Sequence, residues 1–236
     1  MKKRIWELDA FRGICIIAVV IVHLIFDMVE LYPILDWQYP DWFFFLKQWG
    51  GTVFLVLSGV CVTLGSRSVR RGSIVFCAGL LCSAVTYAMS RMGFDDSIII
   101  YFGVLHCLGV CMMVWPLLKK LPWWALGLLG ILGAAAGLHI MNIWVQSRWL
   151  VVIGFACRGF VSSDYFPLLP NLGFFLIGAA VGKTVYRKKE SLLPKMAQSP
   201  FLRPLCFCGR QSLWIYLLHQ PVLAGICYLI FWRLNQ

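Results

Sequence analysis

Charged residues are scarce in this sequence, and acidic residues are the scarcest of them. Lysine and arginine supply 21 of the 236 residues, aspartate and glutamate supply only 10, and charged residues make up 13% of the chain. A soluble domain carries about 25% charged residues, so this composition excludes an ordinary water-soluble protein. With 61% hydrophobic residues and eleven tryptophans, the sequence instead predicts a polytopic membrane protein.

Ten-residue segments of alternating polarity are absent, which excludes an outer-membrane barrel and leaves helices as the way to satisfy the backbone in lipid. The sequence therefore predicts an all-α bundle of about seven transmembrane helices in one domain spanning residues 1–236. The apolar runs long enough to cross the bilayer are 11–28, 49–66, 73–90, 97–118, 122–143, 171–186 and 212–232. Residues 149–155 are too short to span, so we expect an interfacial or re-entrant segment at about 145–165.

The basic residues are unevenly distributed between the two sides of this predicted bundle. Fifteen lysines and arginines fall in segments on the side of the N-terminus, and five fall on the other side. Since basic residues gather on the cytoplasmic side, we expect a cytoplasmic N-terminus. The net charge of +11 is then explained by topology, without nucleic-acid binding. No cysteine pair has the spacing of a zinc site, so no metal is expected.

A polar stripe runs along the first apolar segment. Arg12 and His23 are eleven residues apart, which on a helix returns to within roughly 20° of the same face, about 16 Å further along. Asp27 follows His23 by four residues and lies on the same stripe. Because ionisable side chains are costly inside a bilayer, this stripe is a candidate functional site. It suits either a reaction path or the translocation path of a small-solute transporter, although repeated halves are absent.

Several short motifs in this order resemble those of a known family. They are Leu-Asp-x-Phe-Arg-Gly at 8–13 with His23 following, the segments 54–59, 102–106 and 164–170, and Gly-Arg-x-Ser-Leu at 209–213 running to His219-Gln220-Pro221. The chain resembles the transmembrane acyltransferase superfamily, and within it the short bacterial proteins related to heparan-alpha-glucosaminide N-acetyltransferase. The lysosomal relatives carry asparagine at the position of His23 and a histidine in the loop that follows, which this chain lacks.

The resemblance implies an enzyme that moves an acetyl or other short acyl group from cytoplasmic acyl-CoA to an amine or hydroxyl. An amino sugar or envelope glycan at the outer face is the implied acceptor, and a bacterial plasma membrane is the implied location. Histidine titrates near neutral pH, so His23 suits a general base oriented by Asp27, or else an acyl carrier. The sequence leaves both roles open.

Further residues are assigned to this expected reaction. His106 and His219 lie in other predicted helices and can serve as hydrogen-bond donors to the thioester carbonyl, or as buried polar contacts between helices. Asp164 and Tyr165 lie at the outer side and are candidates for binding the acceptor. Arginines suited to the phosphates of acyl-CoA are Arg12, Arg67, Arg70, Arg71 and Arg210. Small residues on the second, fifth and sixth segments permit a homodimer.

Overall fold

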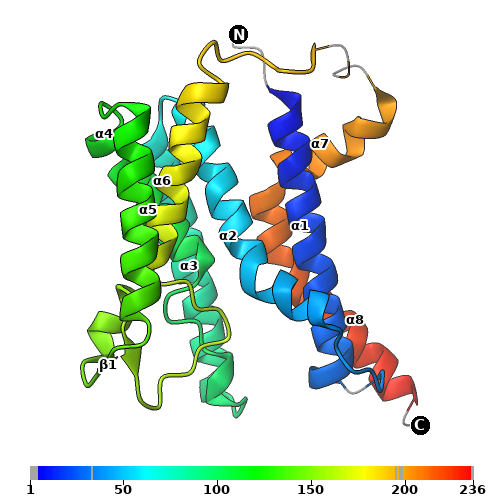
Figure 1. The fold of residues 1–236 in the computed structure, drawn as a ribbon. Helices are drawn as coiled ribbons and strands as arrows, with labels where there is room; N and C mark the ends of the chain where they lie inside the picture. Colours follow the sequence, from blue (N-terminus) through cyan, green and yellow to red (C-terminus); the bar gives the residue numbers. More distant parts are fainter. Residues whose placement is uncertain (1–4, 33, 195, 197–198, 235–236) are drawn as a thin grey trace. The chain divides into compact units, whose positions relative to one another are not determined.

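The computed structural model describes residues 5–32, 34–194, 196 and 199–234, and its elements are almost all helical (Figure 1). The expected all-α fold is confirmed. The long helices are α1 (Trp6–Phe26), α2 (Asp41–Leu64), α3 (Ser68–Arg91), α4 (Val104–Leu118), α5 (Trp123–Ile140), α6 (Leu168–Val185), α7 (Arg203–Arg210) and α8 (Ser212–Leu234). Shorter elements are the π-helical turn η1 (Asp27–Leu31), the 3₁₀ turns η2 (Asp96–Ile98), η3 (Arg148–Val152) and η5 (Pro200–Leu202), and strands β1 (Trp144–Val145) and β2 (Ala156–Cys157).

Five helices in the described part of the chain are long and apolar enough to cross a membrane. They are Trp6–Leu31, Ser68–Arg91, Trp123–Ile140, Leu168–Val185 and Ser212–Leu234, and α2 makes a sixth if its two pieces, bent by 42°, form one span. Large apolar side chains on these helices, such as Leu81, Leu132 and Leu229, are more than half exposed, as expected for contact with lipid. These features indicate an integral membrane protein, although the predicted number of seven spans is not confirmed.

Two predicted segments differ from the structure. The predicted span 97–118 is shortened to the 15 residues of α4, because residues 96–98 form a 3₁₀ turn and the helix begins only after Gly103. Helix α7 lies between the predicted spans 171–186 and 212–232, and Pro204 occupies its first turn, where the missing N–H has no partner to lose. The segment expected to be interfacial or re-entrant contains no helix longer than η3, and β1 pairs in parallel with β2.

The chain forms two compact units, the first comprising residues 1–54 and 190–236. In this unit α7 lies beside α1 (Figure 1). A Cβ atom at Gly13 would collide with the carbonyl oxygen of Leu205, and one at Gly209 would collide with that of Asp9. The two helices are therefore in backbone contact, which only glycine permits here.

A second attachment ties the segment after α6 to the start of α1. The Glu7 carboxylate accepts hydrogen bonds from the Leu192 N–H (2.7 Å) and the Ser191 hydroxyl (2.8 Å). The indole N–H of Trp6 donates to the Leu193 carbonyl oxygen at 2.9 Å. These contacts fix residues 191–193 against the first turn of α1.

The second unit comprises residues 55–189 and holds the rest of α2 with α3 to α6. Its helices also cross at glycines. A Cβ atom at Gly59 would collide with the Phe175 carbonyl oxygen, and one at Gly130 would lie 2.8 Å from that of Gly173. The small residues expected to permit a homodimer are thus packed within the unit, and the homodimer itself stays a prediction.

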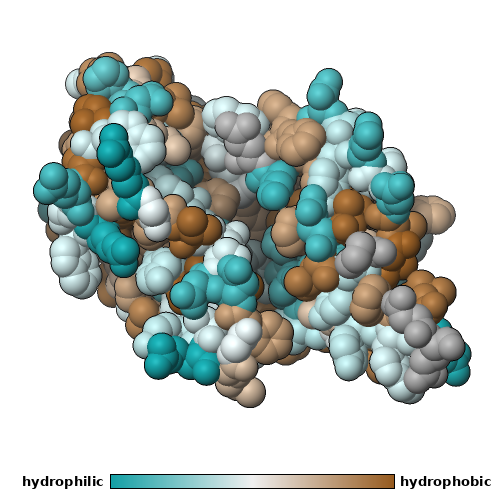
Figure 2. All heavy atoms as spheres, turned by 90° about the horizontal axis from the view of Figure 1, so that it is seen from below, coloured by the Kyte–Doolittle hydropathy of each residue, from teal (hydrophilic) through white to brown (hydrophobic). Residues whose placement is uncertain are grey.

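The face seen from below in Figure 2 mixes hydrophilic and apolar residues.

Candidate active site

The histidine predicted to be catalytic, His23, has a defined hydrogen-bond partner within α1. Its Nδ1 lies 3.0 Å from the carbonyl oxygen of Val19, one turn earlier. A carbonyl oxygen can only accept, so Nδ1 carries the proton and a neutral imidazole keeps its lone pair on Nε2. The ring is partly buried. His23 therefore presents a basic nitrogen rather than a donor.

A second predicted site residue, His219 of α8, lies against His23. The two ring centroids are 4.8 Å apart and the planes stand at 89°. The Nδ1 of His219 lies 2.6 Å from the carbonyl oxygen of Tyr216, and its Nε2 is buried without a hydrogen-bond partner. Both imidazoles therefore share one tautomer, with the proton on Nδ1 and the lone pair on Nε2. The structure brings two potential bases together from segments almost 200 residues apart.

The third residue of this cluster, Asp27, is fully buried at the start of η1. Its two carboxylate oxygens accept hydrogen bonds from one donor, the Gln220 side-chain amide, at 2.9 and 3.1 Å. The expected orienting contact from Asp27 to His23 is not formed, because the Val19 carbonyl holds the only ring nitrogen that donates. Sequence reasoning assigned Gln220 no role. We call His23, Asp27, His219 and Gln220 the α1–α8 cluster.

Arg12 lies on α1, nearer its start than the α1–α8 cluster. Its guanidinium carbon lies 6.0 Å from the centroid of the Phe54 ring, and its Nε is buried without a hydrogen-bond partner. A buried guanidinium N–H that lacks an acceptor is costly, and a phosphate or carbonyl oxygen would satisfy it. Arg210, also in the first unit, is exposed at the end of α7.

His106, in the second unit, is bonded differently from His23 and His219. Its Nδ1 accepts the backbone N–H of Gly103 at 3.2 Å, so the proton lies on Nε2, which is 3.4 Å from the Ser83 hydroxyl oxygen. The ring is 3% exposed and packs between Phe76 and Phe102. Nδ1 closes the start of α4 and Nε2 contacts Ser83 of α3, so both nitrogens are occupied and this geometry favours a structural role over the predicted catalytic one.

Of the predicted acceptor-binding residues, Asp164 also holds the start of α4, and Tyr165 is bonded to η3. An Asp164 oxygen accepts the N–H of Val104 at 3.0 Å, which caps the helix. The Tyr165 hydroxyl donates to the Val151 carbonyl oxygen at 2.7 Å, and burial raises its pKa to about 12. Their described polar contacts are to the protein itself, and acceptor binding stays a prediction for both.

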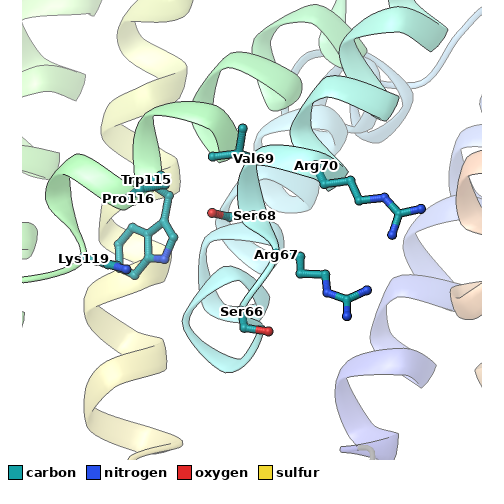
Figure 3. A pocket seen from close by; sticks show the side chains of 9 residues that line it. Ser66, Arg67, Ser68, Val69, Arg70, Trp115, Pro116 and Lys119 are labelled. Atoms are coloured by element: carbon teal, nitrogen blue, oxygen red, sulfur yellow. The ribbon is translucent and has the colours of Figure 1, made fainter.

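A pocket of about 350 Å³ lies at the turn between α2 and α3 and extends to the end of α4 (Figure 3). Figure 3 shows Arg67 and Arg70 extending their guanidinium groups in the same direction, away from the side of the pocket on which Trp115 and Lys119 lie. No carboxylate lines it. Arg71, by contrast, lies against Gly65, where a Cβ atom would collide with its guanidinium group. All of its charged lining residues are cationic, and we call it the α2–α4 basic pocket.

Metal chemistry has no candidate site in the part of the chain described here, since no three His, Cys, Asp or Glu side chains gather closely enough to bind an ion. The ten cysteines, all within the described ranges, are free thiols. Four of them are buried, Cys107, Cys111, Cys206 and Cys227, whereas Cys77 is exposed.

Comparison with known proteins gives one match. No curated protein and no solved structure matches the chain. The family described as heparan-alpha-glucosaminide N-acetyltransferase, catalytic, matches residues 4–221, which include the α1–α8 cluster and the α2–α4 basic pocket. Membership of this family indicates a membrane acetyltransferase, as the sequence motifs had suggested. The chain thus belongs to the family of the catalytic domain of heparan-alpha-glucosaminide N-acetyltransferase.

Proposed function

We propose that this protein transfers an acetyl group from acetyl-CoA to an amine or hydroxyl acceptor, with His23 as the reactive base. The observation that carries the proposal is the His23–His219 pair. In each ring the Nδ1 proton is donated to a main-chain carbonyl oxygen, so that the lone pair lies on Nε2. A proton acceptor held in one tautomer is what acyl transfer requires. The family supports the acetyl group, and an amino sugar or glycan acceptor is proposed from the same source.

In the direct mechanism, the acceptor nitrogen or oxygen attacks the thioester carbonyl carbon. Nε2 of His23 takes the acceptor's proton, the carbon–sulfur bond breaks, and the leaving thiolate of CoA is protonated. His219 can donate through Nε2 only when its ring holds both protons, because its neutral form has a lone pair there. In its neutral form His219 can therefore accept the acceptor's proton from His23, and in its doubly protonated form it can donate a proton to the thiolate.

In the second mechanism, Nε2 of His23 itself attacks the thioester carbonyl carbon, the carbon–sulfur bond breaks, and CoA leaves as the thiolate while Nε2 carries the acetyl group. The acceptor then attacks the acetyl carbon, the bond to Nε2 breaks, and the acceptor's proton passes to the thiolate. The same free Nε2 serves both routes. Intact-mass measurement separates them, since the carrier route adds one acetyl group to the protein when acetyl-CoA is supplied without acceptor.

We propose that cationic side chains bind the phosphates of acetyl-CoA. Arg67 and Arg70 lie together at the α2–α4 basic pocket with Lys119, and Arg12 has an unpartnered Nε. Each guanidinium can form charge-assisted hydrogen bonds with phosphate oxygens, worth about 1.5–3 kcal/mol each. Arg71 and Arg210 remain weaker candidates, because neither lines this pocket. A cytoplasmic N-terminus, supported by the distribution of basic residues, places the α2–α3 turn on the side where acetyl-CoA is made.

The test measures transfer of radiolabelled acetyl from acetyl-CoA to glucosamine by purified protein in detergent. The product is identified by mass spectrometry, because the ten free cysteines would react with a thiol reagent used to detect CoA. We expect His23→Ala to abolish transfer while acetyl-CoA still raises the melting temperature. His139→Ala is the matched control, since His139 is exposed near the end of α5. Unchanged transfer by His23→Ala would remove the catalytic assignment.

The donor site has its own test. Arg67→Ala and Arg70→Ala should each raise the KM for acetyl-CoA by about tenfold, the effect of losing roughly 1.4 kcal/mol of binding. Lys188→Ala is the control, because Lys188 is exposed and absent from the pocket lining. An equal KM in all three variants would move the phosphate site elsewhere. If wild-type protein that is well folded binds no acetyl-CoA, the transporter hypothesis becomes the better one.

A further inference from the structure

Gln220 joins the two helices that carry the imidazole pair, and it lies next to that pair. It follows His219 directly on α8, and its partner Asp27 follows His23 by one turn on α1. The Gln220–Asp27 contact and the His23–His219 contact are therefore neighbours along the same two helices. A shift of α8 along α1 that breaks one contact would displace the other.

The hydrogen bonds between Gln220 and Asp27 only partly offset the cost of burying these two polar groups. The Asp27 carboxylate is fully buried, and the only donor that the structure gives it is one amide nitrogen shared between two oxygens. The amide oxygen of Gln220 is buried without a partner. Apolar residues of similar volume would pack here without these desolvation costs. What the polar pair adds is a fixed position of α8 along α1, because the hydrogen bonds between the amide and the carboxylate require a defined distance and angle.

The backbone of α1 is adapted to this contact. The helix changes to π-helical hydrogen bonding at Asp27, and the Tyr32 N–H reaches the Asp27 carbonyl oxygen at 2.8 Å. A π turn inserts an extra residue and rotates the side chains that follow relative to a regular helix. The carboxylate begins this turn, so its direction toward α8 depends on local backbone geometry as well as on sequence spacing.

From these contacts we propose that Gln220 is a positioning residue for acyl transfer. Its amide holds the Asp27 carboxylate, and the resulting register keeps the His219 ring against His23. This inference rests on the proposed function, because it assigns Gln220 its effect through the imidazole pair. Gln220 touches neither substrate in this account and acts through Asp27 and His219.

The first test separates turnover from binding. Gln220→Ala should lower kcat by about 10- to 100-fold, the effect of displacing a reactive group by about 1 Å, with an unchanged KM for acetyl-CoA. Gln211→Ala is the matched control, since Gln211 is exposed at the end of α7 in the same unit. A structural role alone would reduce the amount of folded protein and leave kcat per folded molecule as in the wild type.

The second test requires no acceptor and no turnover. Diethyl pyrocarbonate acylates unprotonated imidazole nitrogens, and peptide mass spectrometry reports each histidine separately. In Gln220→Ala we expect the rate at His23 to change relative to the exposed His139 in the same molecule. In Gln211→Ala the ratio of the two rates should match that of the wild type.

The third test restores the contact in reverse. Gln220→Glu places two carboxylates together and should abolish transfer, whereas Gln220→Glu combined with Asp27→Asn rebuilds one amide–carboxylate contact and should regain part of kcat. The inference is overturned if Gln220→Ala has wild-type kcat and a wild-type His23 labelling rate, or if the exchanged pair regains nothing. His23→Ala is measured in parallel, because it tests the proposed function and not the role of Gln220. Transfer that is unaffected by His23→Ala would overturn the proposed function itself.

Discussion

The backbone contact between α1 and α7 makes Gly209→Ala a sharp test of the packing in the first unit. The added Cβ would collide with the Asp9 carbonyl oxygen, which is a backbone atom and cannot move aside as a flexible side chain can. The two helices must therefore separate. Overpacking of this kind costs about 1–3 kcal/mol, and we expect the upper end of that range.

The substitution also has a favourable component, because alanine is preferred over glycine inside a helix by about 1 kcal/mol. Gly225→Ala isolates this component, since Gly225 lies in α8 with nothing within 4 Å of its added Cβ. The difference between the two variants is then the collision cost alone. At about 2–4 °C per kcal/mol for a chain of this size, about 3 kcal/mol separates their melting temperatures by about 6–12 °C.

The assay is thermal unfolding in one detergent, followed by circular dichroism and by loss of monodisperse protein. Gly225→Ala should melt at or slightly above the wild-type temperature, and Gly209→Ala well below it. Two variants that melt within about 2 °C of one another would correspond to less than about 1 kcal/mol and would refute close backbone contact between α1 and α7.

Three further substitutions test the contacts of the second unit. His106→Phe keeps a ring but loses both hydrogen bonds, so we expect a lower melting temperature and an unchanged kcat per folded molecule. A tenfold loss of kcat, which corresponds to about 1.4 kcal/mol, would restore the catalytic assignment of His106. Lys183→Met removes two charge-assisted bonds to carbonyl oxygens at the end of α4, each worth about 1.5–3 kcal/mol, and should lower the melting temperature in thermal unfolding. Tyr165→Phe removes one neutral hydrogen bond and should cost about 1 kcal/mol; the predicted role in acceptor binding would also raise the acceptor KM, and an unchanged acceptor KM would leave the hydroxyl with its bond to Val151 alone.

Much of the fold could be predicted because apolar runs determine where membrane helices form. The predicted spans 73–90 and 212–232 differ from α3 and α8 by only a few residues. Ends set by local hydrogen bonding were less predictable. The start of α4 depends on Asp164, which caps the helix from 60 residues away, and a hydropathy pattern cannot predict that contact.

The stripe on the first helix was also predictable, because helical periodicity alone places Arg12, His23 and Asp27 on one face. The partners of those residues were not. Gln220 meets Asp27 across 193 residues of sequence, and no spacing rule relates them. The π-helical turn at Asp27 was likewise not visible, since a helix that changes from i−4 to i−5 bonding has the same composition.

The three histidines show most clearly what sequence patterns omit. His23, His106 and His219 all lie in apolar helices, and the patterns gave no basis for distinguishing their chemistry. In His23 and His219 the Nδ1 partner is a carbonyl of the residue's own helix, so each ring donates there and keeps its basic nitrogen on the other side. In His106 the Nδ1 partner is an N–H group at the first turn of its helix, so that ring takes the opposite tautomer. Position within a helix decides this difference, because N–H groups lack partners only in the first turn and carbonyl oxygens are the only backbone groups within reach further along. A histidine at the third position of a helix is thus suited to close it, and a histidine deep within a helix is suited to act as a base.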